Sequence, residues 1–493
     1  MLGNGCGMRR VLITLFLPIW ISRDRSAVST PTNGPRTACY YRWLHWGVEP
    51  DQLKSLSQFP PTSRNRRATN SVCSHIILGF ASVGSDFKPN LTAVGGLQGV
   101  SRFVNEGRPS PTTKMMLSFG GGGGRQKSFS KMVADRASIH LFQKSLAELI
   151  RLTGLDGVDF DWEFPTFLQS GQFGRFLEQT RLTLNAISGT RAMRTLSQRD
   201  DTPTVVETES SQLTGDQIQS FPTNSNDTIT DEGGINDRPR RMNGMALLEN
   251  DMLELSVAVP GPFTLTAGYS PEHLRDNCTF INVMTYDLVL YEPWHPIAAL
   301  HNALYGQGGV LNVLNLFAVD YSMENWANLG VPKHMLLLGI PTYGVAYELA
   351  KPTLAGHLAI INGYSSLGAN IGYDKTCEII AKHPYNVRFH NKARVPFVHD
   401  SEGNWISYDN ERSVAEKAAF ARAQRYGGVM IFSLNADDPF GKCAKILNDL
   451  QAGKNLTAVD DPEHKFPVEV LSEPFPLTRI AAFALHEAAK ADI

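Results

Sequence analysis

Three carboxylates alternate along one short segment, LDGVDFDWEFP at residues 155–165, where they are Asp159, Asp161 and Glu163. A spacing of two residues is typical of a β-strand, on which alternate side chains share one face. The residues between the acids are apolar, so both faces of the strand need burial, as in a parallel α/β sheet. Crowded, partly buried carboxylates repel one another, which raises the pKa of at least one of them. The segment therefore predicts a glutamic acid that stays protonated near neutral pH and acts as a general acid.

Asp156 lies in the same segment but has the opposite strand parity, so we expect it to be a structural acid in a turn or hydrogen-bond network. Two other interpretations of the three carboxylates are a solvated surface and a Mg²⁺ or Ca²⁺ site. Solvation conflicts with the aromatic residues between the acids. The chain also lacks a phosphate-binding Gly-x-x-x-x-Gly-Lys-Ser/Thr, a His-Glu-x-x-His and a paired Cys-x-x-Cys. We therefore expect neither a metal nor a cofactor.

The composition limits the possible partners. With 493 residues, of which 42% are hydrophobic, the chain can bury a large core. Its formal net charge of −2 gives no reason to expect nucleic acid or an anionic membrane as a partner. We expect a monomer that contacts no membrane unless an N-terminal signal is retained as an anchor.

The N-terminus is interpreted as a secretory signal peptide over residues 1–29, because Arg9 and Arg10 precede an apolar run too short to span a bilayer. Charged residues 23–25 follow this run almost directly, so an uncleaved signal anchor is the alternative. Four glycosylation sequons favour a secreted, extracellular protein. They are at Asn90, Asn226, Asn277 and Asn455.

Eight apolar, β-branched runs alternate with stretches long enough for helices, which predicts an α/β fold, the (β/α)₈ TIM barrel. The expected strands are 38–43, 74–83, 114–121, 154–163, 254–261, 280–288, 336–344 and 427–435. The expected helices include 139–152, 173–187, 297–305 and 412–426. Cys39 lies in the first strand and Cys73 precedes the second. Adjacent parallel strands are within disulfide reach, so we expect these two cysteines to be paired.

Two segments depart from a minimal barrel. Residues 189–244 are polar and contain a single aromatic residue, so we expect a disordered insertion. A long stretch between the seventh and eighth strands contains alternating runs, at 394–398 and 404–408. Residues 451–493 form a C-terminal tail without a cysteine cluster.

The pattern Asp-Gly-x-Asp-x-Asp-x-Glu at 156–163 resembles the signature of glycoside hydrolase family 18, the chitinases and chitinase-like lectins. Six further segments resemble that family's barrel strands in order: 39–41, 74–81, 118–121, 284–287, 339–344 and 427–430. The resemblance implies a TIM barrel over residues 36–450, with a small α+β insertion at 345–411 between strands seven and eight. It also implies a disulfide between Cys377 and Cys443, which leaves Cys278 as a buried thiol.

The resemblance implies retaining hydrolysis in which the acetamido group of the sugar attacks, without an enzyme nucleophile. Glu163 is then the catalytic acid that protonates the leaving oxygen, and Asp161 stabilises the cationic intermediate. Asp159 holds Asp161 and shares a proton with it, while Tyr286 donates a hydrogen bond to the acetamido oxygen. Seven further residues are expected to bind substrate: Tyr41, Phe80, Gly121, Met284, Asp287, Tyr343 and Phe432. For Met284, ordinary core packing is the alternative, and Tyr41, Phe80 and Tyr343 have the alternative of filling the barrel.

Three positions depart from the family pattern. Gly122 follows the third strand where the chitinases have Trp, Phe432 stands where they have a floor Trp, and Val345 follows Tyr-Gly in place of Arg. Sugar faces pack on aromatic rings, so these changes remove apolar contact area. We expect long chitin chains to bind less tightly than they do to a typical chitinase.

Two functions are therefore weighed. The first is a secreted glycosidase that hydrolyses β-1,4-linked N-acetylglucosamine in chitin or chitooligosaccharides. The second is a silent chitinase-like lectin that binds chitooligosaccharides. Retention of Glu163 favours the enzyme, whereas the lost aromatic residues favour the lectin or a different substrate.

The chain also contains two Arg-x-Arg-Arg patterns, at 64–67 and 238–241, of the kind that proprotein convertases cut. The first lies within the Cys39–Cys73 loop, where we prefer a solvated basic loop. The second lies in the polar insertion, where an extended chain can enter a protease.

Overall fold

The computed structural model describes residues 34–57, 71–122, 127–200, 252–307, 310–443, 445–446 and 473–486, with only the backbone of 192–200 and 310–312. The expected signal segment at 1–29 lies outside the described residues. So do Asn226, Asn455 and both Arg-x-Arg-Arg patterns. Among the helices of the described part, none is long and apolar enough to cross a membrane.

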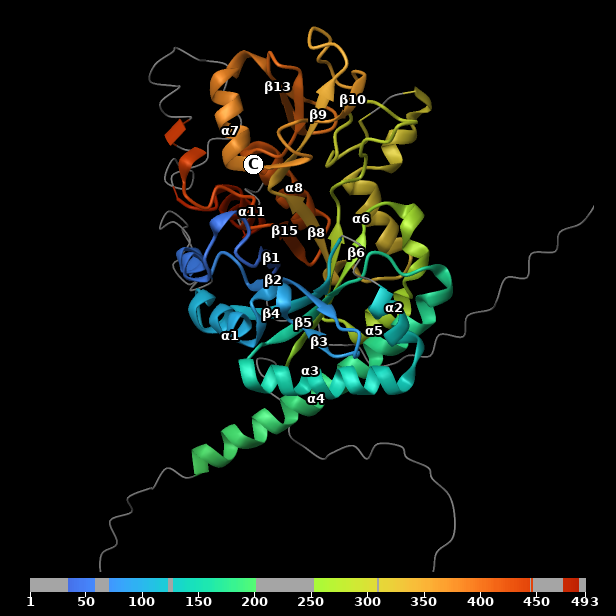
Figure 1. Ribbon diagram of the computed structural model, residues 1–493, viewed down its shortest axis with the longest axis vertical. Coiled ribbons are helices and arrows are strands. Elements are labelled where there is room, and N and C mark those ends of the chain that lie inside the picture. Colours follow the sequence, from blue (N-terminus) through green and yellow to red (C-terminus); the bar gives the residue numbers. More distant parts are fainter. Residues whose placement is uncertain are drawn as a thin grey trace, which may run out of the picture. The chain divides into compact units, whose positions relative to one another are not determined.

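Eight parallel strands form a closed barrel, which confirms the predicted fold (Figure 1). They are β1 (Arg36–Arg42), β2 (His75–Val83), β4 (Lys114–Gly120), β5 (Gly157–Asp161), β6 (Glu254–Pro260), β7 (Phe280–Met284), β8 (Leu336–Pro341) and β15 (Gly428–Phe432). The barrel closes because β1 pairs with β2 on one side and with β15 on the other. A short hairpin partner, β3 (Pro89–Asn90), pairs with β2.

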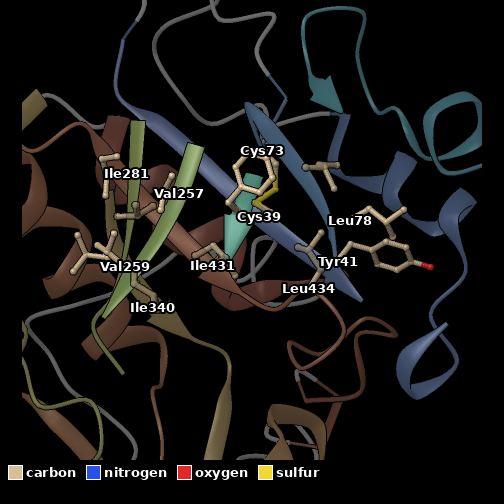
Figure 2. Close-up of a cluster of buried hydrophobic side chains, with 14 of the residues drawn as sticks. Cys39, Tyr41, Cys73, Leu78, Val257, Val259, Ile281, Ile340, Ile431 and Leu434 are labelled. Atoms are coloured by element: carbon tan, nitrogen blue, oxygen red, sulfur yellow. A yellow bond between two sulfur atoms is a disulfide. The ribbon is translucent and has the colours of Figure 1, made fainter. Parts of the chain in front are cut away.

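Alternation along the strands divides their side chains between the barrel interior and an outer layer covered by helices. Figure 2 shows the outer layer, where Cys39 and Tyr41 of β1 lie in the same buried cluster as Val257 and Ile431. The expected Cys39–Cys73 disulfide is present in this layer, with the two Cα atoms 6.0 Å apart. The interior set includes the residues of opposite parity on β1, Ala38 and Tyr40.

The outer helices are α1 (Gly96–Gly107), α2 (Lys127–Ala134), α3 (Arg136–Thr153), α4 (Ser170–Asp200), α5 (Pro271–Asn277), α6 (Val319–Asn328) and α8 (Glu411–Ala423). Helix α3 shows how local sequence sets the boundaries: the Asp135 side chain accepts a hydrogen bond from the N–H of Ser138, and Gly154 ends the helix in the left-handed region.

Two expectations about this layer are wrong. Helix α4 continues to Asp200, past the residue at which we expected disorder to begin. Residues 190–200 contain neither Gly nor Pro, so a helix can continue through this stretch. The helix expected at 297–305 is also absent, because Ile297 forms a β-bridge to Ile360 and the backbone there is irregular.

A second sheet forms the α+β insertion between β8 and β15. Its strands are β9 (Tyr343–Leu349), β10 (Ile361–Tyr364), β11 (Asn370–Gly372), β12 (Val387–His390), β13 (Val395–His399) and β14 (Asn404–Ser407), and its helix is α7 (Tyr373–Lys382). The pairing is antiparallel, in the order β10-β9-β14-β13-β12 with β11 beside β9. The insertion thus begins with β9, the strand that directly follows β8.

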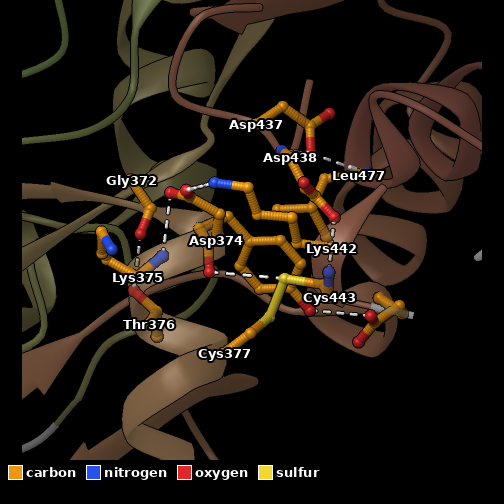
Figure 3. Close-up of a disulfide and its surroundings, with 12 residues drawn as sticks. Gly372, Asp374, Lys375, Thr376, Cys377, Asp437, Asp438, Lys442, Cys443 and Leu477 are labelled. Carbon is orange, nitrogen blue, oxygen red and sulfur yellow. Dashed lines mark hydrogen bonds and ion pairs between the residues drawn. A yellow bond between two sulfur atoms is a disulfide. The ribbon is translucent and has the colours of Figure 1, made fainter. Parts of the chain in front are cut away.

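The expectation that the barrel domain ends at residue 450 is wrong. Helix α11 (Pro476–His486) packs against α8 and β15, and Leu477, Ile480 and Leu485 are buried. Figure 3 shows part of the connection, where the Asp437 carboxylate accepts a hydrogen bond from the backbone N–H of Leu477 at the helix start. The same carboxylate also accepts from the backbone N–H of Thr478 at 2.8 Å. The sequence before the helix is polar and has no periodic pattern, so it does not predict that the helix packs against the barrel.

The second expected disulfide, Cys377–Cys443, lies beside this connection (Figure 3). It joins α7 of the insertion to the segment that follows β15, with the Cα atoms 5.5 Å apart. Cys278 is the remaining cysteine of the described residues, and it is a buried free thiol.

Candidate active site

Asp159 is the most deeply buried carboxyl group of the acidic segment. Its side chain points into the barrel from β5 and is fully buried. The hydroxyl groups of Tyr40, Ser118 and Ser256 donate to its two carboxylate oxygens at 2.8, 2.6 and 2.6 Å, and the amide of Asn282 adds a longer contact of 3.4 Å. These donors come from β1, β4, β6 and β7. Burial raises the pKa of Asp159, while the hydrogen bonds oppose that rise by stabilising the carboxylate.

Asp161 lies two residues further along β5, at the end of the strand, and is 3% exposed. Its Oδ1 atom has no hydrogen-bond partner among the described residues. Burial, followed by the negative charges of Glu163 and Asp159, raises the pKa of this carboxyl well above its ordinary value. A buried carboxyl oxygen without a protein partner is available to a bound ligand.

Glu163 follows the strand and lines the cavity above it. Burial, together with the negative charge of Asp287, raises its pKa to about 7. This carboxyl group is thus protonated in a large fraction of molecules at neutral pH. A half-buried acid with this pKa can donate a proton to a leaving oxygen.

Tyr286 and Asp287 follow the end of β7 and face the same cavity. Burial and the surrounding carboxylates raise the pKa of Tyr286 well above its ordinary value, so its hydroxyl keeps its proton and can donate a hydrogen bond. Asp287 adopts a left-handed backbone with φ of 53°, and its carboxylate lies 3.1 Å from Nδ1 of the buried His301. The Asp287 carboxylate therefore contacts the buried His301 ring on one side and faces the cavity on the other.

The cavity at this end of the barrel has a volume of about 680 Å³. It brings together most of the predicted site residues: Asp161, Glu163, Tyr286, Phe80, Met284, Asp287, Tyr343 and Phe432. The ring of Phe432 contacts those of Tyr40, Tyr286 and Tyr343, with centroids 5.5, 5.6 and 6.3 Å apart. An aromatic floor therefore lies beside the acidic residues.

Gly121 and Gly122 shape the wall next to Phe80. A Cβ atom on Gly121 would lie 2.7 Å from the ring of Phe80, and Gly121 has φ of +78°, so glycine is required there. A Cβ on Gly122 would lie 3.7 Å from both carboxylate oxygens of Glu163. A side chain at position 122 would therefore enter the cavity directly beside the acid.

Tyr41 does not lie in the cavity, and the expectation that it binds substrate is wrong. Its hydroxyl donates to the carbonyl of Val48 at 2.8 Å, and its ring stacks on Phe103 in the outer layer. Tyr40 has the opposite parity and reaches Asp159 instead. The two tyrosines are adjacent in the sequence, and strand parity places them on opposite faces without telling which face is the interior one.

Other predicted residues lie away from the chemistry. Asp156 accepts hydrogen bonds from Arg108 Nη1 at 2.7 Å and from the N–H of Met115 at 2.8 Å, which places it in a network that joins β4 to β5. Val345 is fully buried among the apolar residues around the insertion sheet. Sequence reasoning missed Ser118, Ser256 and Asn282, because nothing local marks them as partners of Asp159.

The described residues include no group of three or more His, Cys, Asp or Glu side chains that could hold a metal ion. The chemistry that they do offer is a proton donor beside two buried carboxyl groups and an aromatic floor. Functional residues of a TIM barrel lie where these do, at the C-terminal ends of the strands. Fold and site together define a TIM-barrel protein with an acidic, aromatic-lined cleft at the C-terminal ends of its strands.

Comparison with known proteins gives the family. The model of glycosyl hydrolases family 18 matches residues 36–201 and 239–437, and the chain belongs to this family. It is 25% identical over 432 residues to a probable endochitinase of Caenorhabditis elegans, a match that covers 85% of this chain and 59% of that relative. The chain thus spans less than two thirds of the length of that relative.

Solved structures share the fold. An immunomodulatory chitinase from Trichuris suis superposes with a TM-score of 0.63 at 18% identity, over 92% of this chain and 100% of the other. Human YKL-39, described as a pseudo-chitinase with retained chitooligosaccharide binding, superposes with a TM-score of 0.61 at 19% identity, over the same shares. Proteins that share this fold therefore include a chitinase and a protein described as a pseudo-chitinase.

Proposed function

We propose that the protein is a glycosidase that hydrolyses β-1,4-linked N-acetylglucosamine in chitin or chitooligosaccharides. The observation that carries this proposal is the pKa of about 7 at Glu163, a carboxyl group that lines the cavity above two buried carboxyl groups. An acid with this pKa serves no need of the fold, because burial of a titratable group costs stability. Its position suits proton donation to a ligand.

In the proposed mechanism the acetamido group of the sugar attacks the anomeric carbon, while Glu163 protonates the departing oxygen. The oxazolinium ion that forms is cationic, and Asp161 stabilises it at close range as a carboxylate, because the proton that it shares with Asp159 moves onto Asp159. Asp159, fixed by donors from four strands, orients Asp161 from below. Tyr286 keeps its proton and donates a hydrogen bond to the acetamido oxygen. Water then opens the intermediate with Glu163 as the base, which gives retention of configuration.

A silent lectin is the second candidate. Gly122 is exposed beside Glu163 and presents no side chain to a sugar, and Phe432 gives a smaller floor than Trp. Less apolar contact area weakens the binding of a substrate and the strain that binding can impose on it. These two positions favour a lectin or a ligand of other shape, whereas the intact set of acids favours the enzyme.

Hydrolysis of fluorogenic chitobiose and chitotriose conjugates tests the proposal, with Glu163→Gln as the variant. Loss of a general acid typically lowers turnover by at least about 10²-fold, while glutamine keeps the shape of the side chain. Unchanged hydrolysis by Glu163→Gln would refute the mechanism. Absence of hydrolysis by the unaltered protein, with chitooligosaccharide binding retained, would establish the lectin.

We further propose that the protein is secreted and glycosylated. Asn90 is exposed at the end of β3, and its Oδ1 accepts a hydrogen bond from the N–H of Thr92 at 3.0 Å. Asn277 is half-buried at the end of α5, where its amide donates to the carbonyl of His273. Two disulfides suit an oxidising compartment. Mobility of the secreted protein before and after removal of N-glycans tests this.

A further inference from the structure

Arg42 is a basic side chain in a cleft whose other charged groups are carboxylates. It is the last residue of β1, and it lines the same cavity as Asp161, Glu163 and Asp287. It follows Tyr40 by two residues, so it lies one level above Tyr40 on the interior face of the strand. A guanidinium group therefore stands at the mouth of the barrel, on the side of the cleft formed by β1.

The guanidinium of Arg42 has no carboxylate partner among the described residues. The hydrogen bonds of Arg42 to Asn435 involve its backbone: the N–H of Arg42 donates to Oδ1 of Asn435 at 2.7 Å, and the carbonyl of Arg42 accepts from Nδ2 of Asn435 at 2.9 Å. Burial lowers its pKa, and no neighbouring acid opposes this effect. A half-buried, unpaired cation is costly unless a ligand supplies the opposite charge.

The catalytic carboxyl groups cannot supply that charge. The strands β1 and β5 are three steps apart around the barrel, in the order β1, β2, β4, β5. The charges that act on Asp161 and Glu163 are those of other carboxylates. The cleft is thus divided by charge, with acids on the β5 and β7 walls and Arg42 on the β1 wall.

The loop after Arg42 supplies a sugar-sized apolar surface. Trp46 lines the same cavity and is 44% exposed, although its backbone is in the left-handed region with φ of 55°. Asn435 holds this loop as well, because its amide also donates to the carbonyl of His45 at 2.7 Å. A large ring held outward in an uncommon backbone conformation suits stacking against a sugar face.

We infer that the β1 side of the cleft binds a sugar that carries a negative charge, a sulfate or a carboxylate, with its anion on Arg42 and its face on Trp46. The ligand is then an anionic oligosaccharide of N-acetylglucosamine, an inference that rests on the proposed function. A guanidinium binds either group through two parallel hydrogen bonds. The sugar beside Glu163 is neutral, because an anion there would meet Asp161 and Asp287.

The test compares the binding of neutral chitotetraose with that of its 6-O-sulfated and 6-carboxylated forms by calorimetric titration. All proteins carry Glu163→Gln, so that no ligand is consumed. Arg42→Gln removes the charge and Arg42→Lys keeps it without the planar fork. Arg136→Gln is the matched control, since Arg136 is exposed on α3 and does not line the cavity.

We expect at least one anionic ligand to bind about tenfold more tightly than the neutral one, as for a charge-assisted hydrogen bond. Arg42→Gln abolishes this preference, Arg42→Lys reduces it, and Arg136→Gln retains it. The carboxylated and sulfated ligands show which anion fits. Equal affinity for neutral and anionic ligands, or a preference that survives Arg42→Gln, overturns the inference, as does failure of every ligand to bind. Hydrolysis of neutral chitooligosaccharides by the protein with Glu163 intact is read separately and reports on the proposed function alone.

Discussion

The charge of Asp287 should raise the pH at which the proposed enzyme loses activity. Glu163 has a pKa of about 7, raised first by burial and then by the negative charge of Asp287. The protonated form is the active one, so kcat/KM should fall as pH rises through about 7. For a single proton, kcat/KM at pH 8 should be about one eleventh of its value in acid, and at pH 9 about one hundredth.

Asp287→Asn removes the charge while it keeps the size of the side chain. The ionised form of Glu163 then meets less repulsion, so its pKa should fall and the alkaline limb of the profile should move to lower pH. The position of the limb is the readout, because substitution at a cavity-lining residue also changes the absolute rate. Asp276→Asn is the matched control, since Asp276 lies on α5 and pairs with the neighbouring Arg275 on the surface.

The assay is kcat/KM for a fluorogenic chitobiose conjugate between pH 5 and pH 9, with folding checked at each pH by circular dichroism. The reasoning fails if the unaltered protein shows no loss of kcat/KM up to pH 9. It also fails if Asp287→Asn leaves the limb where it was, or if Asp276→Asn moves the limb equally.

Three further predictions concern stability, affinity and processing. The pKa of Glu163 is raised in the folded protein, so ionisation of Glu163 destabilises the fold as pH rises from 4.5 to about 7. Urea titrations at pH 4 and pH 8 should therefore show that Glu163→Gln gains at most about 3 kcal/mol in free energy of unfolding, relative to the unaltered protein, over this pH range. No gain would contradict the raised pKa. Phe432→Trp, alone or with Gly122→Trp, should tighten chitooligosaccharide binding several-fold by added apolar contact; unchanged affinity with the fold intact would mean a cleft shaped for another ligand. Convertase cleavage at 238–241 should give two fragments on a denaturing gel, since neither disulfide joins the chain before that site to the chain after it; a single full-length band after expression in convertase-containing cells would rule this out.

The acidic segment could be interpreted from sequence because its information is local. Alternation on a strand places Asp159 and Asp161 on one face wherever that strand lies, and Glu163 comes two residues after the strand ends. The apolar residues between them require covered faces, so the strand had to belong to a parallel sheet. The count of eight strands and the position of Cys39 and Cys73 next to neighbouring strands then led to the barrel and its first disulfide.

Closure of the barrel decided what the sequence left open. The donors to Asp159 come from β1, β4, β6 and β7, so they lie far apart in the chain and meet only when the sheet closes. Closure also chose Tyr40 over Tyr41, because two adjacent tyrosines carry no local sign of which faces inward. Helix α11 packs on the barrel and is joined to it by a hydrogen bond from the N–H of Leu477 to the buried Asp437 carboxylate. The two residues are 40 positions apart, and no periodic pattern in the sequence predicts this contact. Side-chain alternation is a property of one strand, whereas the direction of each face depends on all eight.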